Sequence, residues 1–177
     1  MIFGFPLWQE FVGDLPTGAE IARIAVRLLF AVVLGGVLGL ERRQVGKAAG
    51  MRTHMLVALG SALVILVPQL TGMSSADLSR VIQGALTGIG FIGGGVILKL
   101  SQEHQIVGVT TAASIWLTAT VGIAIGTGRL GLAVVGTVLA LVILTTFGRF
   151  EDWVIGKAKS ASDSKPSEDV GQPHPTK

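Results

Sequence analysis

The sequence contains no cysteine and has few charged residues. Cysteine is absent from all 177 positions, which excludes disulfides, thiolate metal sites and cysteine nucleophiles. Charged residues make up 14% of the chain and apolar residues 50%, whereas soluble domains carry roughly 25% charged residues. A soluble fold of this length needs polar side chains over most of its surface. The composition therefore predicts a membrane protein.

Five long stretches of the chain carry almost no charge. Each approaches the ~20 residues that an α-helix needs to cross ~30 Å of hydrocarbon. Lipid cannot satisfy free backbone groups, and the stretches lack the alternation of barrel strands, so helices are expected. We predict an all-α membrane protein, a compact bundle of five transmembrane helices over residues 21–40, 53–69, 81–98, 109–127 and 130–147.

Two terminal segments differ in composition from these spans. Residues 1–18 are rich in Phe and Leu and contain Trp8, which is typical of a segment at the membrane interface. They lack a leading cation and a small-residue cleavage site, so they do not resemble a signal peptide. Residues 154–177 are rich in Ser, Pro, Lys and acids without an apolar period, which predicts a disordered cytoplasmic tail. The transmembrane domain is expected over residues 19–153.

The distribution of charge predicts the orientation of the chain. The loop after the first span contains Arg42, Arg43, Lys47 and Arg52, whereas the segment before that span contains Glu10, Asp14 and Glu20. The positive-inside rule makes this loop cytoplasmic, so the N-terminus is expected outside and the C-terminus in the cytoplasm. A second interpretation is that the loop also binds anionic lipid or a partner. The net charge of +3 does not indicate nucleic-acid binding, because no aromatic-rich basic module is present.

Charged residues at the edges of the first span need partners or access to water. Glu41 follows the span directly and is next to Arg42, and Arg52 returns nearby, which predicts a shielded ion pair at the membrane edge. Arg27 lies roughly 9 Å below the outer surface at ~1.5 Å per residue, where an arginine costs ~2.5–3.5 kcal/mol. It either extends to the surface or has a buried partner, for which Asp77 is the candidate. Arg23, four residues earlier, can pair with Glu20.

Glycines recur four residues apart in the spans, at Gly35 and Gly39, Gly84 and Gly88, Gly90 and Gly94, and Gly122 and Gly126. This spacing places both members of a pair on one helical face and predicts close helix packing. Three successive glycines, Gly93 to Gly95, exceed what one packing face needs. They could permit a kink or a locally broken helix, which in transporters often marks a substrate site, so a gating or ion-lining role is the alternative to helix packing.

Hydroxyl residues form a stripe in the fourth span. Thr110, Ser114 and Thr118 repeat every four residues, and Thr111 and Trp116 flank them. Gln83 and Thr87 of the third span, also four residues apart, could face this stripe. Interhelical hydrogen bonds of ~1 kcal/mol or less are one explanation. Lining a hydrated path is the other.

His54 is the polar residue that begins the second span. A second His, Asp or Glu at ligand spacing is missing from its helix, so we interpret His54 as a helix-start residue at the interface rather than a proton relay or metal ligand. Ser61 lacks a nucleophile-elbow pattern and an identifiable base. The sequence therefore does not indicate an enzyme.

Three blocks of sequence, "GLERRQVGKAAGMRTHMLVALGSAL", "IQGALTGIGFIGGGVILK" and "VGVTTAASIWLTATVGIAIG", resemble the MgtC/SapB family of bacterial inner-membrane proteins. The resemblance implies a multi-pass five-helix domain in the bacterial inner membrane, linked to growth at low magnesium and to survival inside host cells. It also implies, from some relatives, action on other membrane machines such as the F-type ATP synthase.

The resemblance is carried by particular positions of this sequence. The residues that match the family pattern are Arg27, Glu41, Arg42, Gly50, Arg52, Thr53, His54, Gly88, Gly90, Gly93, Gly95, Gly108, Thr110, Thr111, Ala112, Ala113 and Trp116. Arg43, Ala48 and Val107 depart from the pattern. Many relatives continue into a cytosolic C-terminal domain, so a short form of the family is expected.

Two functions follow from these observations. The first is a regulatory membrane protein that acts through a membrane partner in adaptation to low magnesium or host-cell stress. The second is a channel or transporter for Mg²⁺ or another ion. Mg²⁺ prefers carboxylates and other oxygens, yet spans two to five contain no Asp or Glu in their interiors, so the first is favoured. No cofactor is expected; Mg²⁺ is the candidate if the chain is a channel or transporter. The glycine faces predict a homo-oligomer, in the simplest case a dimer.

Overall fold

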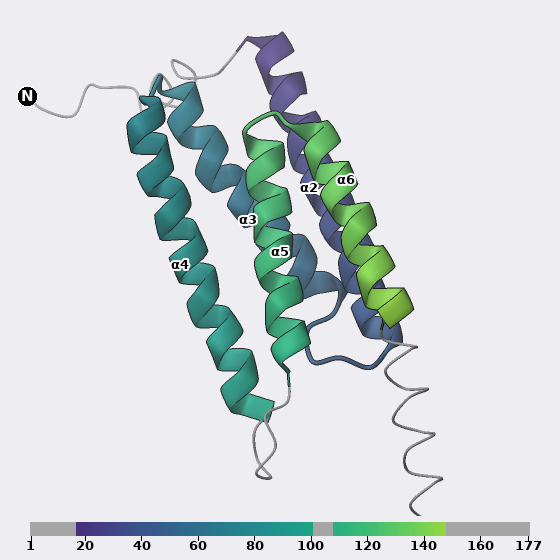
Figure 1. The fold of residues 1–177 in the computed structure, drawn as a ribbon. Helices are drawn as coiled ribbons and strands as arrows, with labels where there is room; N and C mark the ends of the chain where they lie inside the picture. The colour runs from purple at the N-terminus through teal and green to yellow at the C-terminus, as the bar shows by residue number, and fades with distance from the viewer. Residues whose placement is uncertain (1–16, 101–107, 148–177) are drawn as a thin grey trace, which may run out of the picture. The chain divides into compact units, whose positions relative to one another are not determined.

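The chain forms a bundle of α-helices in a computed structural model that describes residues 17–100 and 108–147. Its helices are α2 (Gly18–Gln44), α3 (Met51–Leu70), α4 (Ser75–Leu100), α5 (Val109–Gly126) and α6 (Leu130–Val142), followed by a π-helical turn, η1 (Ile143–Phe147) (Figure 1). The described residues contain no β-strand. The predicted five-helix fold is therefore confirmed, whereas the predicted tail and nearly all of the interfacial segment lie outside the described residues.

Four of the helices, α2 to α5, are long and apolar enough to cross a membrane, and residues 130–146 form a shorter apolar helical stretch. Helices α2 and α4 begin before the predicted spans, because polar residues cap their N-terminal ends. Glu20 accepts hydrogen bonds from the backbone N–H and the hydroxyl of Thr17, both at 2.8 Å, and Ser74 accepts one from the Asp77 backbone N–H at 3.2 Å. Such capping interactions satisfy orphan backbone donors and set the first residue of α2 and of α4.

The C-terminal ends of α3 and α5 are closed by glycines in the left-handed region. Gly72 has a φ of 71° and Gly128 a φ of 81°. After α5, the Gly128 N–H donates to the Ile125 carbonyl at 2.9 Å and the Arg129 N–H to the Ala124 carbonyl at 2.8 Å. This pattern is a Schellman motif, and it leaves the Gly126 carbonyl, at the last residue of α5, available to another group.

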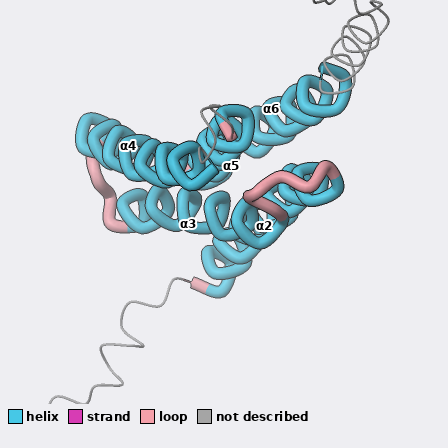
Figure 2. Tube along the Cα trace, turned by 90° about the horizontal axis from the view of Figure 1, so that it is seen from below, coloured by secondary structure: helices cyan, strands magenta, loops and turns pink. Residues whose placement is uncertain are grey.

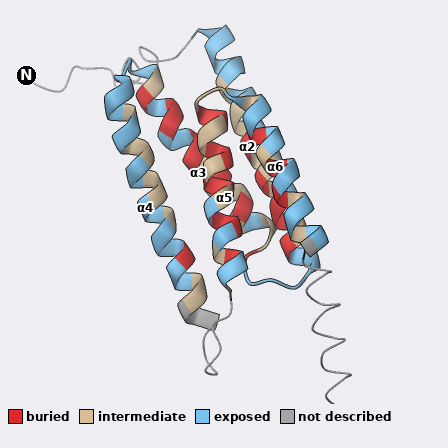
Figure 3. Cartoon of the chain, viewed as in Figure 1, coloured by how far each residue is buried: buried red, intermediate tan, exposed pale blue. Residues whose placement is uncertain are grey.

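Helices α3 and α5 occupy the middle of the bundle. Each contacts the other, and both contact α2 and α4. Viewed from below, α4, α5 and α6 form one row and α3 and α2 a second (Figure 2). Buried residues concentrate on α3 and α5 (Figure 3); half of the most apolar window of α5 is buried, but only 6% of that of α4. Helix α4 therefore leaves most of its surface open to lipid or to a partner.

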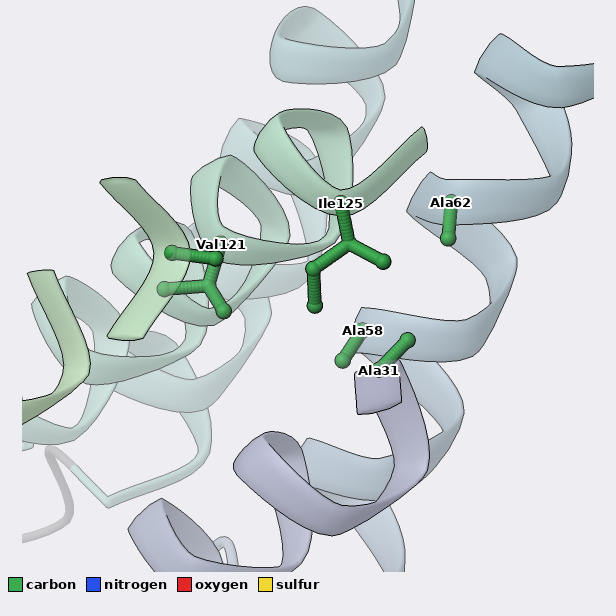
Figure 4. Close-up of a cluster of buried hydrophobic side chains, with 6 residues drawn as sticks. Ala31, Ala58, Ala62, Val121 and Ile125 are labelled. Carbon is green, nitrogen blue, oxygen red and sulfur yellow. The ribbon is translucent and has the colours of Figure 1, made fainter. Parts of the chain in front are cut away.

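The core is built from small side chains. Ala31 from α2, Ala58 and Ala62 from α3, and Val121 and Ile125 from α5 form one buried cluster (Figure 4), which Ala133 of α6 joins. Helices that meet through alanine approach closely and gain dispersion contacts along their backbones. This cluster consists of aliphatic side chains, and the buried polar residues of the bundle lie outside it.

Glycines allow the closest approaches, and the structure separates the predicted pairs into two classes. A Cβ atom on Gly39 would lie 2.5 Å from the Met51 Cα, and one on Gly126 would lie 2.8 Å from the Ile65 Cβ. Gly35 and Gly122 are equally crowded against α3, so these two pairs pack as predicted. The pairs on α4 do not. A Cβ on Gly84, Gly88, Gly90 or Gly94 would meet no atom within 4 Å in the structure, because these glycines face away from the bundle.

The chain divides into two compact units, residues 1–141 and 142–177. The first contains the bundle described above. Of the second, the structure describes residues 142–147 alone, the last residue of α6 and the η1 turn.

Candidate functional site

Most of the family-like polar residues gather at one end of the bundle. The C-terminal ends of α2 and α4 and the N-terminal ends of α3 and α5 lie at this end (Figure 1). Five residues there are defined as the polar cluster: Glu41, Arg42, His54, Thr111 and Ser114. Four of them are buried, and Glu41 is half-buried. Gly39, two residues before Glu41, lies against His54, where an added Cβ would be 3.0 Å from the His54 Cβ. The His54 Nε2 lies 3.3 Å from the Ser114 Oγ, so α2, α3 and α5 each contribute to one polar site.

Glu41 and Arg42 form a bidentate ion pair within the polar cluster. The Arg42 Nε donates to the Glu41 Oε2 at 2.5 Å, and the Arg42 Nη2 donates to Oε1 at 2.9 Å. Arg42 is only 3% exposed, so the predicted shielded pair is confirmed. Arg52, which the sequence places nearby, is exposed and makes no ion pair among the described residues. The two-point geometry offsets the desolvation of the charges.

One nitrogen of the Arg42 guanidinium does not take part in the pair with Glu41. Its Nη1 atom is buried and has no hydrogen-bond partner in the structure. A buried donor without a partner costs free energy, and the pairing with Glu41 reduces but does not remove this cost. The side chains are 4% (Arg42) and 13% (Glu41) exposed, so both charges are largely desolvated and removal of either partner leaves the other uncompensated.

His54 is fully buried between α3 and α5. It lies in the first turn of α3, as predicted, and its exposure of 0% shows that the bundle encloses it; its position at the membrane interface stays a prediction. Its Nδ1 lies 2.9 Å from the Gly50 carbonyl oxygen and its Nε2 lies 3.3 Å from the Ser114 Oγ. Space for the ring comes from Gly39, where a Cβ would lie 3.0 Å from the His54 Cβ. A larger residue at position 39 would first meet the Met51 Cα at 2.5 Å and the Gly50 carbonyl oxygen at 2.9 Å, so α2 and α3 would have to separate.

Counting hydrogens restricts the protonation of this site. A carbonyl oxygen only accepts, so the His54 Nδ1 that faces Gly50 carries a hydrogen. The Ser114 hydroxyl has a single hydrogen and two neighbours, the Thr111 carbonyl at 2.7 Å and the His54 Nε2 at 3.3 Å. When His54 is neutral, this hydrogen can satisfy either neighbour but not both. When His54 is doubly protonated, Nε2 donates to Ser114 and the hydroxyl donates to Thr111.

The buried hydroxyl face of α5 differs from the predicted stripe. Thr111, Ser114 and Thr118 are buried, whereas Thr110 is exposed, because positions three and four apart face α3 together at 3.6 residues per turn. The Thr118 hydroxyl donates to the Ser114 carbonyl at 2.8 Å, so it is satisfied within its own helix. Apart from the contact between Ser114 and His54, this face makes no interhelical hydrogen bond within the described residues, and it does not form a polar seam.

Residues of α4 do not complete the site. Gln83 and Thr87 are exposed, so the prediction that they face the hydroxyls of α5 is wrong. Helix α4 continues without interruption through the glycine run, so the local break that these glycines could permit does not occur. Gly93 is buried, and a Cβ there would lie 3.5 Å from the Ala112 Cβ. Gly90 and Gly95 face open space.

Two further family-like side chains lie at the edge of this end of the bundle. Trp116 is 46% exposed and turns its ring outward from α5, which is a position typical of aromatic residues in a membrane. Thr53 is half-buried beside His54 in the first turn of α3. Neither side chain makes a hydrogen bond to another described residue, so neither belongs to the polar cluster.

Arg27 lies in the half of α2 away from the polar cluster and has a partner that the sequence did not suggest. Its Nη1 donates to the Gly126 carbonyl at 3.2 Å, the acceptor that the Schellman motif of α5 leaves free. The negative end of the α5 dipole favours a cation there. Asp77 instead accepts a hydrogen bond from the Ser74 hydroxyl at 2.7 Å. The predicted pairing of Arg27 with Asp77 is therefore wrong.

The chemistry of the described residues is cationic and hydrogen-bonding rather than metal-ligating. Within residues 17–100 and 108–147, no group of three or more His, Asp or Glu side chains could hold a metal ion. Glu41 is the one carboxylate of the polar cluster, and both of its oxygens accept from Arg42. The sequence did not indicate the contact of His54 with Ser114, which lies sixty positions away, or its contact with the Gly50 backbone carbonyl.

These features define a helical membrane protein whose first, second and fourth apolar helices enclose a small polar site. The sequence profile of the MgtC family matches residues 28–153. The chain belongs to the MgtC family.

Several curated relatives share most of this chain. It is 44% identical to Protein SrpB of Synechococcus elongatus over 77% of this chain and 81% of that one. It is 42% identical to the putative magnesium transporter YhiD of Escherichia coli over 71% of this chain and 61% of that one, and 37% identical to Protein MgtC of Brucella abortus over 70% of this chain and 50% of that one. The chain thus spans between half and four-fifths of these relatives. No solved structure matches it.

Proposed function

We propose that this chain is a regulatory protein of the bacterial inner membrane that acts through another membrane protein, such as the F-type ATP synthase, in adaptation to low magnesium or host-cell stress. The observation that carries this proposal is the closed ion pair of Glu41 and Arg42. Both oxygens of the Glu41 carboxylate are occupied by Arg42, so the polar cluster offers no free carboxylate to a divalent cation.

The interior of the bundle supports the same conclusion. Mg²⁺ binds through carboxylates and other oxygens and gives up water reluctantly. The described core contains alanine, valine and isoleucine, and the buried hydroxyls of α5 donate to carbonyls of their own helix. A cation moving between α3 and α5 would meet aliphatic atoms at van der Waals distance.

Helix α4 supplies the surface for a partner. Gly84, Gly88 and Gly95 lie on one side of α4 and would each accept a Cβ without meeting another atom within 4 Å. In α2 and α5 the same spacing of glycines is used for close contact with α3. Glycine-lined faces let transmembrane helices approach closely, so a helix of a partner, or α4 of a second copy in a homodimer, fits this surface.

A second candidate function is transport of Mg²⁺. It is favoured by the similarity to a relative named a putative magnesium transporter. Under this alternative the path for the ion would form between copies of the chain, along the open face of α4, because the described bundle itself is filled.

Two measurements separate these functions. The first is Mg²⁺ uptake by liposomes that contain the purified full chain, and the second is recovery of a membrane complex with the tagged chain. We expect no uptake above that of empty liposomes, and a complex that is lost in Gly88→Leu but kept in Gly131→Leu. Gly131 is an equally open glycine on α6, which makes it the matched control. Uptake that depends on protein concentration would establish the second function instead.

A further inference from the structure

A pocket lies between α2 and α3 at the end of the bundle opposite the polar cluster. Its volume is about 210 Å³. Arg23 and Arg27 of α2 and Gln69 of α3 supply its polar wall, while Ile24, Leu66 and Leu70 supply its apolar wall. Glu20 stands at its rim. Neither the polar cluster nor the proposed function uses this pocket.

Its polar wall has more donors than acceptors. Arg23 and Arg27 are four residues apart and so are neighbours on one face of α2, an arrangement that is unfavourable for two like charges alone. Glu20 offsets part of this charge, but it is fully exposed, and one of its oxygens accepts two hydrogen bonds from Thr17. Neither the Arg23 nor the Gln69 side chain has a hydrogen-bond acceptor in the part of the chain that the structure describes.

Arg27 is held in place by one hydrogen bond, which leaves other N–H donors of its guanidinium for a ligand. One of its nitrogens, Nη1, donates to the Gly126 carbonyl, and Gly128 lies so close that a Cβ there would be 2.8 Å from the Arg27 Nη2. A guanidinium has five N–H donors, so several remain for a ligand. The contact with the end of α5 holds Arg27 in position, and a preorganised arginine loses little freedom when it binds an anion.

The position of the pocket suits an anion at the membrane surface. Side chains on a helix point towards its N-terminus, so the guanidinium groups of Arg23 and Arg27 extend towards the start of α2. Arginine in this setting keeps its stem in hydrocarbon and its head at the level of the lipid headgroups. The apolar wall continues into exposed apolar surface at Ile21 and Leu70. A ligand with an anionic head and apolar chains would meet matching surfaces in both parts.

We infer that this pocket binds a phosphate group, through Arg23 and Arg27 with Gln69 as an additional donor. Arginine pairs with phosphate through two parallel hydrogen bonds, which makes it suited to this chemistry. The phosphate can belong to an anionic phospholipid or be free in solution. In either case it would join α2 to α3 and, through Arg27, to the end of α5.

The test measures phosphate binding by the full chain and by three variants. Arg23→Gln removes a donor from the pocket. Gln69→Leu keeps the approximate size of the side chain and removes the amide. Arg80→Gln is the control, because Arg80 is exposed near the start of α4, outside the pocket, and its loss changes net charge equally. Arg27 is left intact, since it also holds the end of α5.

One arm uses nanodiscs of phosphatidylglycerol or of phosphatidylcholine, with retained lipid counted by native mass spectrometry. The other titrates inorganic phosphate against protein in a neutral detergent and follows the thermal unfolding temperature. We expect Arg23→Gln to weaken binding about tenfold, as loss of a charge-assisted hydrogen bond does, and Arg80→Gln to leave it unchanged. Gln69→Leu is expected to weaken it less than Arg23→Gln.

Each outcome decides the inference. Retention of phosphatidylglycerol alone identifies a lipid as the source of the phosphate, whereas a shift by inorganic phosphate that needs Arg23 identifies a soluble one. Equal losses in Arg23→Gln and Arg80→Gln would show a general effect of charge and overturn the site. Binding of neither probe by the wild-type chain would overturn it as well. Neither result depends on whether the chain regulates a partner or transports Mg²⁺.

Discussion

His54 and Ser114 meet inside the bundle, with the histidine Nε2 3.3 Å from the serine Oγ, although sixty positions separate them in the chain. The contact joins the first turn of α3 to α5 at a place where both residues are buried. Helix α2 makes it possible, because Gly39 leaves room for the imidazole ring. A polar link of this kind fixes the rotation of α3 against α5, which alanine packing alone would specify less strictly.

Replacing Ser114 tests the energetic value of this link. In Ser114→Ala the His54 Nε2 is buried without a partner, which is expected to cost about 1–3 kcal/mol of the free energy of unfolding. Thr118→Val is the control, because its hydroxyl bonds only to its own helix, and it should cost less than about 1 kcal/mol. Unfolding of both variants in detergent, followed by circular dichroism, gives the comparison. Equal losses would mean that the contact with His54 contributes nothing.

The ion pair at the end of α2 should respond more strongly to the loss of one partner than to the loss of both. Glu41→Gln leaves the buried Arg42 charge without compensation, and a loss of about 3–5 kcal/mol is expected. The double variant Glu41→Gln with Arg42→Met removes the charge itself and should recover much of that loss. Arg43→Gln, at an exposed neighbouring position, should change stability by less than about 0.5 kcal/mol. A double variant no more stable than Glu41→Gln would contradict the explanation.

Two classes of glycine should respond oppositely to a methyl group. In Gly122→Ala the new Cβ meets the Ala58 carbonyl, so α3 and α5 must separate, at a cost of about 1–3 kcal/mol. In Gly84→Ala the Cβ enters open space, and the higher helix propensity of alanine should stabilise the monomer by up to about 1 kcal/mol. Thermal unfolding in detergent distinguishes them. Destabilisation of the monomer by Gly84→Ala would show that α4 packs differently.

The partner of Arg27 can be tested with a double-mutant cycle. Arg27→Gln removes the charge that faces the Gly126 carbonyl and should lower the free energy of unfolding by about 0.5–1.5 kcal/mol. Asp77→Asn should add independently, with a coupling energy to Arg27 below about 0.5 kcal/mol. A coupling energy well above that value would restore the ion pair that the sequence suggested.

The orientation in the membrane stays a prediction, and the absence of cysteine makes it easy to test. A single cysteine at Ala48, in the exposed stretch between α2 and α3, provides one labelling site in the whole chain. The positive-inside rule predicts that it reacts with an impermeant maleimide only after the membrane is opened. Labelling of intact spheroplasts would reverse the orientation.

The sequence by itself determined the five helices, because the length of an apolar run and the need to satisfy backbone groups in lipid are local properties. It also determined the ion pair of Glu41 and Arg42, since adjacent residues at the end of a helix need no distant information to meet. For the glycines it indicated which residues share a face. It did not indicate which face meets another helix, and so the pairs of α2 and α5 could not be distinguished from those of α4.

Only the tertiary structure decided the remaining contacts. The Arg27 partner is a backbone carbonyl, a group present at every residue and therefore without a signal in the sequence. His54 and Ser114 lie on helices whose mutual rotation depends on all the small residues between them, and a shift of one position moves a side chain by about 100° around a helix with 3.6 residues per turn. Periodicity fixes what a helix presents on each side, whereas close packing of the whole bundle fixes what that side touches.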